Sequence, residues 1–414
     1  MNLIFFDHPV NRDHLKPFTL TRPLSDIRCG ILRLGEKWQQ RLTPLVRQAS
    51  HLTEPYLSVR FPLQVEADNL LVNPAFCPDE ALVRAVGNLQ KGQVLLQKGQ
   101  AIAIRLGAEE LLAFKDASYN DNDMLDLWEL DIGRTPVAYT GDVSSVSNLW
   151  DIFLLNGNQI KRDFSLLTQG RLSQTIADPH TVFYGDQMDI FIEEGAQIKA
   201  SILNAESGPI YIGKNAVVHE NAVLLGPMAL LEGSHINISS KIREATTIGP
   251  FSKMGGEVKN VVVFGNSNKG HEGFLGNSVV GEWCNFGADT NNSNLKNNYQ
   301  PVKLWSYHHQ NFENSGQLFC GLMMGDHSKC GINTMFNTGT VVGVSANIFG
   351  AGYQSKFIPS FSWGGADSHT TYRVDKALEV ASHVMQRRGV QMDEAEKHIL
   401  RHIFENRATE MKRT

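Results

Sequence analysis

The sequence has no large excess of charge of either sign, and this excludes several classes of partner. Thirty-eight Lys and Arg residues against 43 Asp and Glu give a formal net charge of -5 and a pI near 6.3. A chain with this balance has no broad positive field for holding nucleic acid or an anionic membrane. Any anionic ligand must therefore bind at a local cluster of basic side chains.

Long hydrophobic runs and paired cysteines are also absent. The opening Met1 to Phe6 is too short for a signal peptide, and no later apolar run reaches membrane-spanning length. The cysteines are odd in number and form no CxxC pair that would suggest a zinc site or a disulfide framework. We therefore expect a cytoplasmic protein without a membrane partner, in which five thiols are buried: Cys29, Cys77, Cys284, Cys320 and Cys330.

Several common catalytic motifs are missing too. The chain contains no Walker A loop, no dinucleotide GxGxxG turn and no GxSxG elbow. His398 and His402 are four residues apart on a predicted helix, but the glutamate of the HExxH metal motif is absent. We interpret these two histidines as part of a solvated helix face.

What the sequence does contain is a six-residue period. Neither a helix nor an ordinary strand repeats every six residues. Short strands that each send one large side chain inward, with three strands completing a triangular coil, do have this period. The pattern therefore predicts a parallel β-helix of hexapeptide repeats over about residues 181–356. Branched or large apolar residues follow the period in two runs: Ile212, Val218, Leu224, Leu230, Ile236, Ile242 and Ile248, then Leu318, Met324, Cys330, Phe336, Val342 and Ile348.

The rest of the chain has different patterns, and 414 residues exceed what one core usually organises. Residues 1–180 predict an α/β domain, with strands over 1–7 and 93–106 and helices over 32–45, 79–89 and 149–167. Residues 357–414 predict a C-terminal extension with helices over 373–385 and 393–404. We expect these last helices to cover the open end of the coils, because terminal coils expose unpaired edges.

The residues from Gly265 to Thr290 read GNSNKGHEGFLGNSVVGEWCNFGADT. This segment resembles the acetyltransferase half of the GlmU family, the bifunctional N-acetylglucosamine-1-phosphate uridyltransferase and glucosamine-1-phosphate N-acetyltransferase. In that family "SKxGHLxYLGD" leads into "NIGAGT". The similarity extends over about residues 185–355 and implies a left-handed β-helix, acetyl-coenzyme A as co-substrate and a homotrimer.

The resemblance also implies site residues. His271 falls on the family's general base, and a neutral histidine suits the removal of an amine proton near pH 7. Lys253 in GPFSK and Lys259 in EVK fall on basic residues that hold a sugar phosphate. Asn285 or Asn294 would orient the sugar. The family has a tyrosine directly after the asparagine that corresponds to Asn294, whereas this chain has Leu295. The resemblance therefore does not identify the sugar or the acyl group.

Two further segments carry functional hypotheses. The connection from Lys296 to Gly321 is longer than in the family, and a loop of this size on a solenoid is often a binding element. The stretch FTLTRPLSDIRCG, with EKW shortly after it, resembles a divergent sugar nucleotidyltransferase branch. Its Arg22, Arg28 and Lys37 are candidates either for pairing with nucleotide phosphates or for a structural role.

The N-terminal resemblance is incomplete. The "AAGxGTR" turn that wraps phosphates with backbone N–H groups is missing. Nucleotidyl transfer normally needs Mg²⁺, but the sequence has no clear "GD" aspartate that would bind this ion. Asn73 stands at the comparable position. Loss of nucleotidyltransferase activity in this half is therefore one hypothesis.

Three functions follow from these observations. The first is a GlmU-like transferase that moves an acetyl group from acetyl-coenzyme A to an amino-sugar 1-phosphate on the β-helix. The second is a sugar-1-phosphate nucleotidyltransferase whose β-helix is only a scaffold. The third is a non-catalytic sensor of a sugar nucleotide. The missing Gly-rich turn favours the first over the second, and His271 argues against the third.

Overall fold

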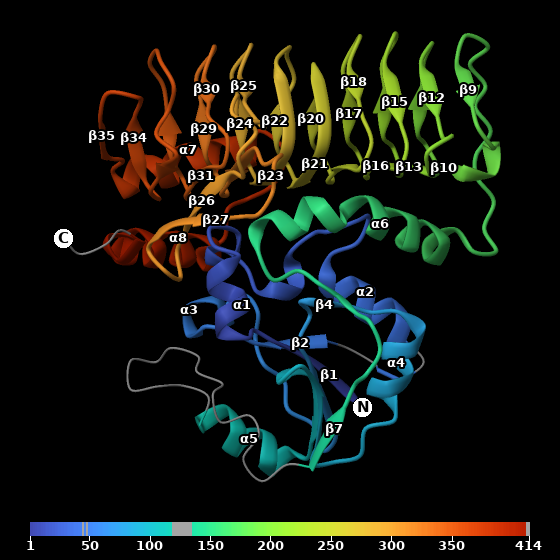
Figure 1. Cartoon of the computed structure of the whole chain (residues 1–414), viewed down its shortest axis with the longest axis vertical. Helices are drawn as coiled ribbons and strands as arrows, with labels where there is room; N and C mark the ends of the chain where they lie inside the picture. The colour runs from blue at the N-terminus through green and yellow to red at the C-terminus, as the bar shows by residue number, and fades with distance from the viewer. Residues whose placement is uncertain (44, 47–48, 118–134, 411–414) are drawn as a thin grey trace.

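The chain folds into an N-terminal α/β part and a long β-helix that lies across it (Figure 1). The computed structural model describes residues 1–43, 45–46, 49–117 and 135–410. Among these residues, no helix has both the length and the hydropathy needed to cross a membrane. All five cysteines are buried and free, as predicted.

The N-terminal part is built on a six-stranded mixed sheet in the order β2-β1-β3-β6-β5-β7. Its strands are β1 (Asn2–Phe6), β2 (Ala49–Leu52), β3 (Asn69–Val72), β5 (Gln93–Gln97), β6 (Gln100–Leu106) and β7 (Thr135–Ala138). β1 is parallel to both β2 and β3, and β6 is antiparallel to β3. A short pair, β4 (Phe76–Cys77) with β8 (Ser144–Ser145), lies apart from this sheet.

Helices pack on both faces of the sheet. They are α1 (Pro9–His14), α2 (Leu34–Leu42), α3 (Pro55–Ser58), α4 (Glu80–Gly87) and α5 (Ala108–Ala117), with 3-10 turns η1 (Phe18–Leu20) and η2 (Leu24–Asp26). The predicted helices over 32–45 and 79–89 correspond to α2 and α4. The predicted strand over 93–106 is a hairpin, because Lys98 and Gly99 both have positive φ and form the tight turn between β5 and β6.

The β-helix is a parallel, left-handed coil with three faces. The first face contains β10 (Ile190–Ile192), β13 (Ile210–Ile212), β16 (Met228–Leu230), β19 (Thr246–Ile248), β28 (Leu322–Met324), β31 (Thr340–Val342) and β33 (Phe357–Ile358). Two longer strands, β21 (Glu257–Gly265) and β23 (Phe274–Glu282), join this face to the third face because each pairs with strands of both.

The other two faces follow in each coil. The second face contains β11 (Gln197–Ile198), β14 (Val217–Val218), β17 (His235–Ile236), β20 (Lys253–Met254), β22 (Asn268–Lys269), β24 (Asn285–Phe286), β29 (Lys329–Cys330), β32 (Asn347–Ile348) and β34 (Ser362–Gly364), which pairs with β35 (His369–Thr371). The third face contains β9 (Val182–Tyr184), β12 (Ile202–Asn204), β15 (Val223–Leu225), β18 (Lys241–Ile242), the starts of β21 and β23, and then β25 (Asn291–Asn292) and β30 (Met335–Phe336).

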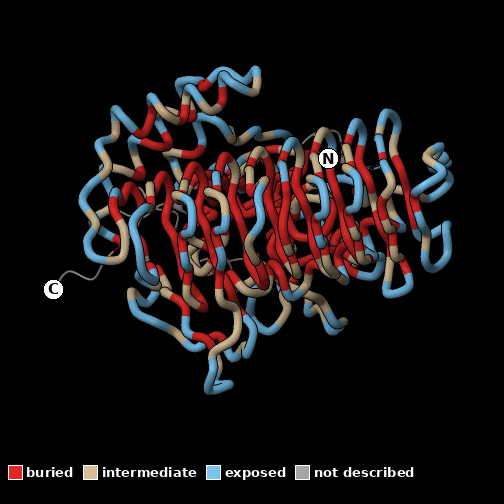
Figure 2. Tube along the Cα trace, turned by 90° about the horizontal axis from the view of Figure 1, so that it is seen from above, coloured by how far each residue is buried: buried red, intermediate tan, exposed pale blue. Residues whose placement is uncertain are grey.

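The six-residue period places its residues inside the coils, as predicted. The seven aliphatic residues from Ile212 to Ile248 are fully buried in one continuous core. Buried residues recur from coil to coil along the whole β-helix (Figure 2). The prediction is wrong for Leu318, which is 45% exposed. Leu318 lies in the insertion between β25 and β28, where the chain leaves the coil and the period is interrupted.

The N-terminal part packs on the first face of the β-helix. Helix α6 (Leu149–Thr168) runs along the coils between the two parts (Figure 1). Outward side chains of the first face, such as Phe264 and Met323, share a buried cluster with Phe18 and Phe153 from the N-terminal part. Burial of such large apolar side chains stabilises the junction.

The C-terminal helices are α7 (Val374–Gln386) and α8 (Glu394–Asn406), followed by the turn η4 (Arg407–Glu410). Both helices occur where they were predicted. They pack against Trp283, Val344 and Phe361, which lie at corners of different late coils, and against Leu57 of α3. They therefore cover a flank of the late coils instead of the open end that we expected, and the ladder itself continues to β34.

Candidate functional site

His271 lies at the corner between the second and third faces, in the turn that joins β22 to β23. The residue is exposed, and its imidazole makes no hydrogen bond or ion pair within the described part of the chain. It borders a shallow pocket of about 390 Å³. The ring is therefore accessible to a ligand. The other lining residues are His219, Asn237, Ile238, Gly255, Gly256, Gly270 and Glu272.

The backbone around His271 is held by Lys269, which the sequence analysis did not single out. The Lys269 side chain is 1% exposed, and its Nζ donates to the carbonyl oxygens of Gly255 at 3.1 Å, His271 at 3.1 Å and Gly273 at 2.8 Å. Burial lowers the pKa of Lys269 to about 8. The buried ammonium group is thus satisfied by three carbonyls, and it fixes the turn that presents His271.

Basic side chains lie at the opposite edge of the third face. Lys259 ends the third-face segment of β21, next to Val258. Arg243 lies beside it one coil earlier, because the ladder pairs Ile242 with Val258 and the Arg243 N–H donates to the Val258 carbonyl oxygen at 2.8 Å. The Arg243 Nη1 lies 3.3 Å from the Glu257 Oε1. Arg243 and Lys259 are therefore neighbouring cations on adjacent coils, and Arg243 also lies 3.7 Å from Glu244.

Asn294 belongs to the same edge. Lys259 pairs across the ladder with Gly276, and the Asn294 Nδ2 donates to the Oδ1 of the neighbouring Asn277 at 2.8 Å. The third face is consequently bordered by His271 on one side and by Arg243, Lys259 and Asn294 on the other. A ligand that spans this short strand would contact both edges.

Lys253 and Asn285 lie elsewhere, on the second face. Lys253 is in β20 and Lys259 is in β21, so the structure separates the two lysines that the resemblance assigned to one phosphate. The physical reason is their spacing: six residues is one side of the triangular coil, and the chain turns a corner between them. Asn285 accepts a hydrogen bond from Asn268 at 2.9 Å on this second face.

The second-face pocket is strongly basic. It has a volume of about 730 Å³ and lies between β20, β24 and helix α7. Lys253, Lys329, Arg387 and Arg388 line it, and its described lining residues include no carboxylate. None of the four makes an ion pair within the described residues. Burial lowers the pKa of Lys329 to about 8, so this lysine is partly desolvated before any ligand binds. The pocket is suited to a phosphate-bearing ligand.

The three N-terminal candidates Arg22, Arg28 and Lys37 are buried and bound within the chain. Arg22 forms ion pairs with Asp326, at a corner of the β-helix, and with Glu282 at 3.4 Å. Lys37 forms a buried ion pair with Asp163 of α6. Arg28 donates to the carbonyl oxygens of Ile31 and Phe264. All three join the N-terminal part to α6 or to the β-helix, and their nucleotide role stays a prediction.

The carboxyl ends of β1 and β3 would be the natural place for a nucleotide and Mg²⁺ in such a sheet. Asp7 follows β1, but its carboxylate already accepts from Arg12 at 3.0 Å, the Leu24 N–H at 2.8 Å and the Thr53 hydroxyl at 2.6 Å. Asn73 follows β3 and is completely buried. At this edge the described residues therefore do not fit a magnesium ion.

Comparison with known proteins bears on both parts of the chain. A family model described as sugar nucleotidyl transferase matches residues 3–172. The bifunctional protein GlmU of Methanocaldococcus jannaschii is 34% identical over 118 residues, which are 28% of this chain and 26% of that protein. GlmU of Corynebacterium diphtheriae is 31% identical over 189 residues, which are 42% of this chain and 35% of that protein.

A third relative is the bifunctional sugar-1-phosphate nucleotidylyltransferase/acetyltransferase of Sulfurisphaera tokodaii, 29% identical over 164 residues, which are 38% of this chain and 37% of that protein. Parts of the chain are therefore similar to GlmU proteins and to a sugar nucleotidyl transferase model. The chain spans between about a quarter and two fifths of the length of these relatives. Among solved structures, the UDP-N-acetylglucosamine acyltransferase from Campylobacter jejuni matches 54% of this chain and 94% of its own, with 13% identity and a TM-score of 0.27.

Besides Lys269, sequence reasoning missed two groups of residues. Arg243 was missed because only the register shows that it lies beside Lys259; its one signal was a basic residue directly after the inward Ile242. Lys329 and Arg388 were missed because they are 59 positions apart and meet only when α7 docks on the second face. The sequence signal that could have indicated this pocket was the recurrence of a lysine directly after a corner in two coils, at Lys253 and Lys329.

Proposed function

We propose that the chain is a GlmU-like transferase that moves an acetyl group from acetyl-coenzyme A to an amino-sugar 1-phosphate on its β-helix. The observation that carries the proposal is the third face, where His271 borders one edge and Arg243 with Lys259 the other. In this proposal the two cations hold the acceptor's phosphate and Asn294 orients the sugar. The amine is then presented to His271 across one short strand.

The reaction needs one base. The acceptor nitrogen attacks the thioester carbon, the C–N bond forms, and the C–S bond breaks to release coenzyme A as the thiolate, to which His271 then passes the proton taken from the nitrogen. His271 takes the proton that the nitrogen loses, which a positioned imidazole does well near neutral pH. Lys269 keeps the turn of His271 in place by its three carbonyl contacts.

We assign Lys253 to the donor instead of the acceptor. The basic pocket on the second face would receive the phosphate groups of acetyl-coenzyme A, with Lys253, Lys329 and Arg388 as their partners. Its volume and charge support this assignment. The corner that carries His271 lies between this face and the third face, so a thioester extending from the pocket would approach the base.

The alternative hypothesis, a sugar-1-phosphate nucleotidyltransferase whose β-helix is only a scaffold, has less support. The buried ion pairs of Arg22 and Lys37, together with the occupied Asp7 carboxylate, weigh against a nucleotide and Mg²⁺ at the carboxyl edge of the N-terminal sheet. We propose that this part now serves to hold the β-helix through α6. A neighbouring copy completing the acyl site in a homotrimer is part of the same proposal.

The test is thiol release from acetyl-coenzyme A with glucosamine 1-phosphate and related amino-sugar phosphates. His271→Ala should lower turnover by about 10²- to 10⁴-fold. Arg243→Gln should raise the KM for the acceptor, and Arg388→Gln the KM for acetyl-coenzyme A, each by about tenfold or more, since a hydrogen bond to a charged group contributes about 1.5–3 kcal/mol. Lys214→Gln, an exposed lysine on an early coil paired with Glu194 at 3.6 Å, is the control.

The outcomes separate the parts of the proposal. If Lys253→Gln raises the acceptor's KM and not the donor's, the assignment of Lys253 is wrong. If His271→Ala is as fast as the wild type, the base lies elsewhere. If no amino-sugar phosphate supports thiol release, the β-helix is a scaffold and the acyltransferase proposal fails.

A further inference from the structure

Three histidines outside the acyl site lie together where the N-terminal part meets the 296–321 insertion. His14 is the last residue of α1. His308 and His309 lie in the turn between β26 (Lys303–Ser306) and β27 (Asn311–Asn314), the antiparallel hairpin of the insertion. A ring nitrogen from each of the three lies within 4.8 Å of the others. The cluster exists only in the fold, because its two segments are far apart in the sequence.

The state of His14 suits a ligand. Its Nε2 is buried and has no hydrogen-bond partner within the described residues. An imidazole nitrogen that has no hydrogen-bond partner is free to bind a metal ion.

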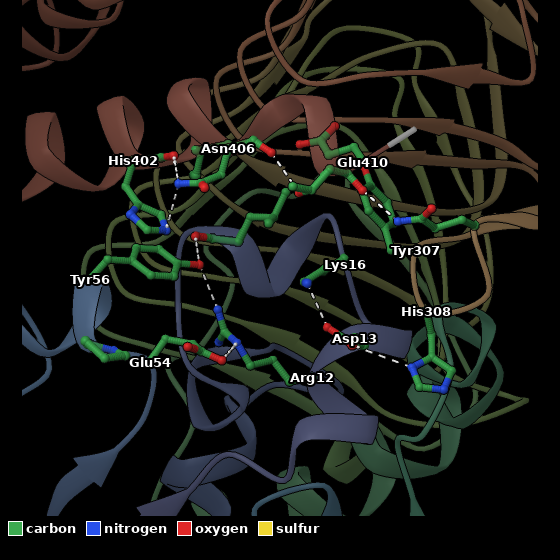
Figure 3. Close-up of a pocket in the computed structure, with 15 residues that line it drawn as sticks. Arg12, Asp13, Lys16, Glu54, Tyr56, Tyr307, His308, His402, Asn406 and Glu410 are labelled. Atoms are coloured by element: carbon green, nitrogen blue, oxygen red, sulfur yellow. Dashed lines mark hydrogen bonds and ion pairs between the residues drawn. The ribbon is translucent and has the colours of Figure 1, made fainter. Parts of the chain in front are cut away.

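Carboxylates hold the other two rings. The Asp13 Oδ2 lies 3.5 Å from the His308 Nδ1, and the Glu313 Oε1 lies 3.3 Å from the His309 Nε2. Figure 3 shows the Asp13 carboxylate between the Lys16 ammonium group and the His308 ring. Histidines that bind metals usually engage their second nitrogen in this way, which fixes the ring and raises its basicity. Each of these two rings keeps one nitrogen for a metal.

We infer that His14, His308 and His309 bind a divalent transition metal, for which Zn²⁺ is the best fit. Three imidazoles and an open fourth position are a known ligand set for Zn²⁺, whereas Mg²⁺ and Ca²⁺ take oxygen ligands. Zn–N bonds of about 2.0–2.1 Å in a tetrahedron place the nitrogens roughly 3.3 Å apart. The rings therefore need to approach one another by no more than about 1.5 Å, which side-chain rotation in an exposed hairpin allows.

The site borders a cavity. Asp13 and His308 also line a pocket of about 600 Å³ between α1, the insertion and α8. Arg12, Tyr56 and Glu410 line the same pocket (Figure 3). A metal with an open position at this place would both tie the insertion to α1 and face a space large enough for a small ligand.

The test is titration of Zn²⁺ into chelator-treated full-length protein, followed by calorimetry, with Mg²⁺ in parallel. We expect one Zn²⁺ per chain, no response to Mg²⁺, and an intense visible absorption when Co²⁺ replaces Zn²⁺, as tetrahedral coordination produces. His309→Ala, at an exposed position that folding does not need, should weaken binding at least tenfold, and Glu313→Gln by about tenfold. His398→Ala, which removes an exposed histidine of α8, should change nothing.

Two results would overturn the inference. One is the absence of a Zn²⁺ site of micromolar or tighter affinity in the wild type. The other is Zn²⁺ binding that survives in His309→Ala but is lost in His398→Ala, which would place the metal on α8. Because none of these readouts uses acyl transfer, the inference stands or falls independently of the proposed function.

Discussion

Replacing Arg22 with methionine tests whether this residue holds the two parts together or binds a nucleotide. Arg22 is 5% exposed and pairs with Asp326 and with Glu282 at 3.4 Å, both on the β-helix. Its guanidinium also lies over the Phe264 ring, 5.2 Å from the centroid. Methionine keeps most of the apolar volume but leaves Asp326 without its cation, while Glu282 keeps only Arg33, at 3.9 Å.

The expected cost follows from the partners that remain. Breaking a buried ion pair by removing one partner costs about 3–5 kcal/mol, because the other charge stays buried and unpaired. Asp326 keeps the Thr21 hydroxyl at 2.7 Å and the Glu282 N–H at 2.9 Å. These two donors partly compensate, so we expect the lower end, about 3 kcal/mol.

Arg33→Met is the matched control. Arg33 carries the same charge at the same junction and lies 3.4 Å from Asp26 and 3.9 Å from Glu282, but its side chain is 35% exposed. Exposed pairs contribute about 0–1 kcal/mol, because water already solvates both charges. The control should therefore unfold close to the wild type.

The assay is urea unfolding followed by tryptophan fluorescence, with nucleotide binding by calorimetry on the same proteins. We expect the urea midpoint of unfolding to drop clearly for Arg22→Met and not for Arg33→Met. The nucleotide affinity of the folded Arg22→Met protein should equal that of the wild type. Undiminished stability together with loss of nucleotide binding would refute the structural role and restore Arg22 as a phosphate ligand.

Three further predictions follow. Burial raises the pKa of Glu396, but its hydrogen bond to His327 and the charge of Arg60 outweigh burial and lower the pKa to about 2. Ionised Glu396 therefore stabilises the folded state by an amount on the order of 3 kcal/mol. This stabilisation is fully present above the unfolded pKa of 4.5 and is lost as the pH falls through 2. Wild-type stability should thus fall more than that of Glu396→Gln in acid unfolding. Light scattering should give three times 46.0 kDa, and a monomer would contradict the proposal that neighbouring copies share an acyl site. Calorimetry with uridine and deoxythymidine nucleotides should show weak binding, whereas rapid pyrophosphate release would contradict the occluded sheet edge.

Periodicity predicted the β-helix well because its core is local. An inward residue at every sixth position, from Ile212 to Ile248, is dictated by the coil itself and needs no partner from elsewhere in the sequence. The helices α2, α4, α6, α7 and α8 were predicted for the same reason, since their apolar positions repeat along one face. The prediction for Leu318 was wrong because an insertion interrupts the coil there. Counting every sixth residue does not show where such an interruption occurs.

The candidate site was only half predictable. His271 and Lys259 stand in motifs and could be named, but the grouping of residues depends on register and docking. A six-residue step separates Lys253 from Lys259 onto different faces, while a full coil brings Arg243 beside Lys259. Arg22 and Lys37 look like phosphate ligands in the sequence, and only the packing of the N-terminal part on the first face shows their carboxylate partners.

The sequence by itself determined the coil, its inward residues and the place of His271, because each depends on neighbours within a few positions of the chain. Tertiary structure decided which charges meet: Arg22 with Asp326, Lys329 with Arg388 in one pocket, and His14 with His308 and His309. Electrostatic and metal-binding properties act through space over a few ångströms, so they depend on contacts between distant segments that no local pattern encodes.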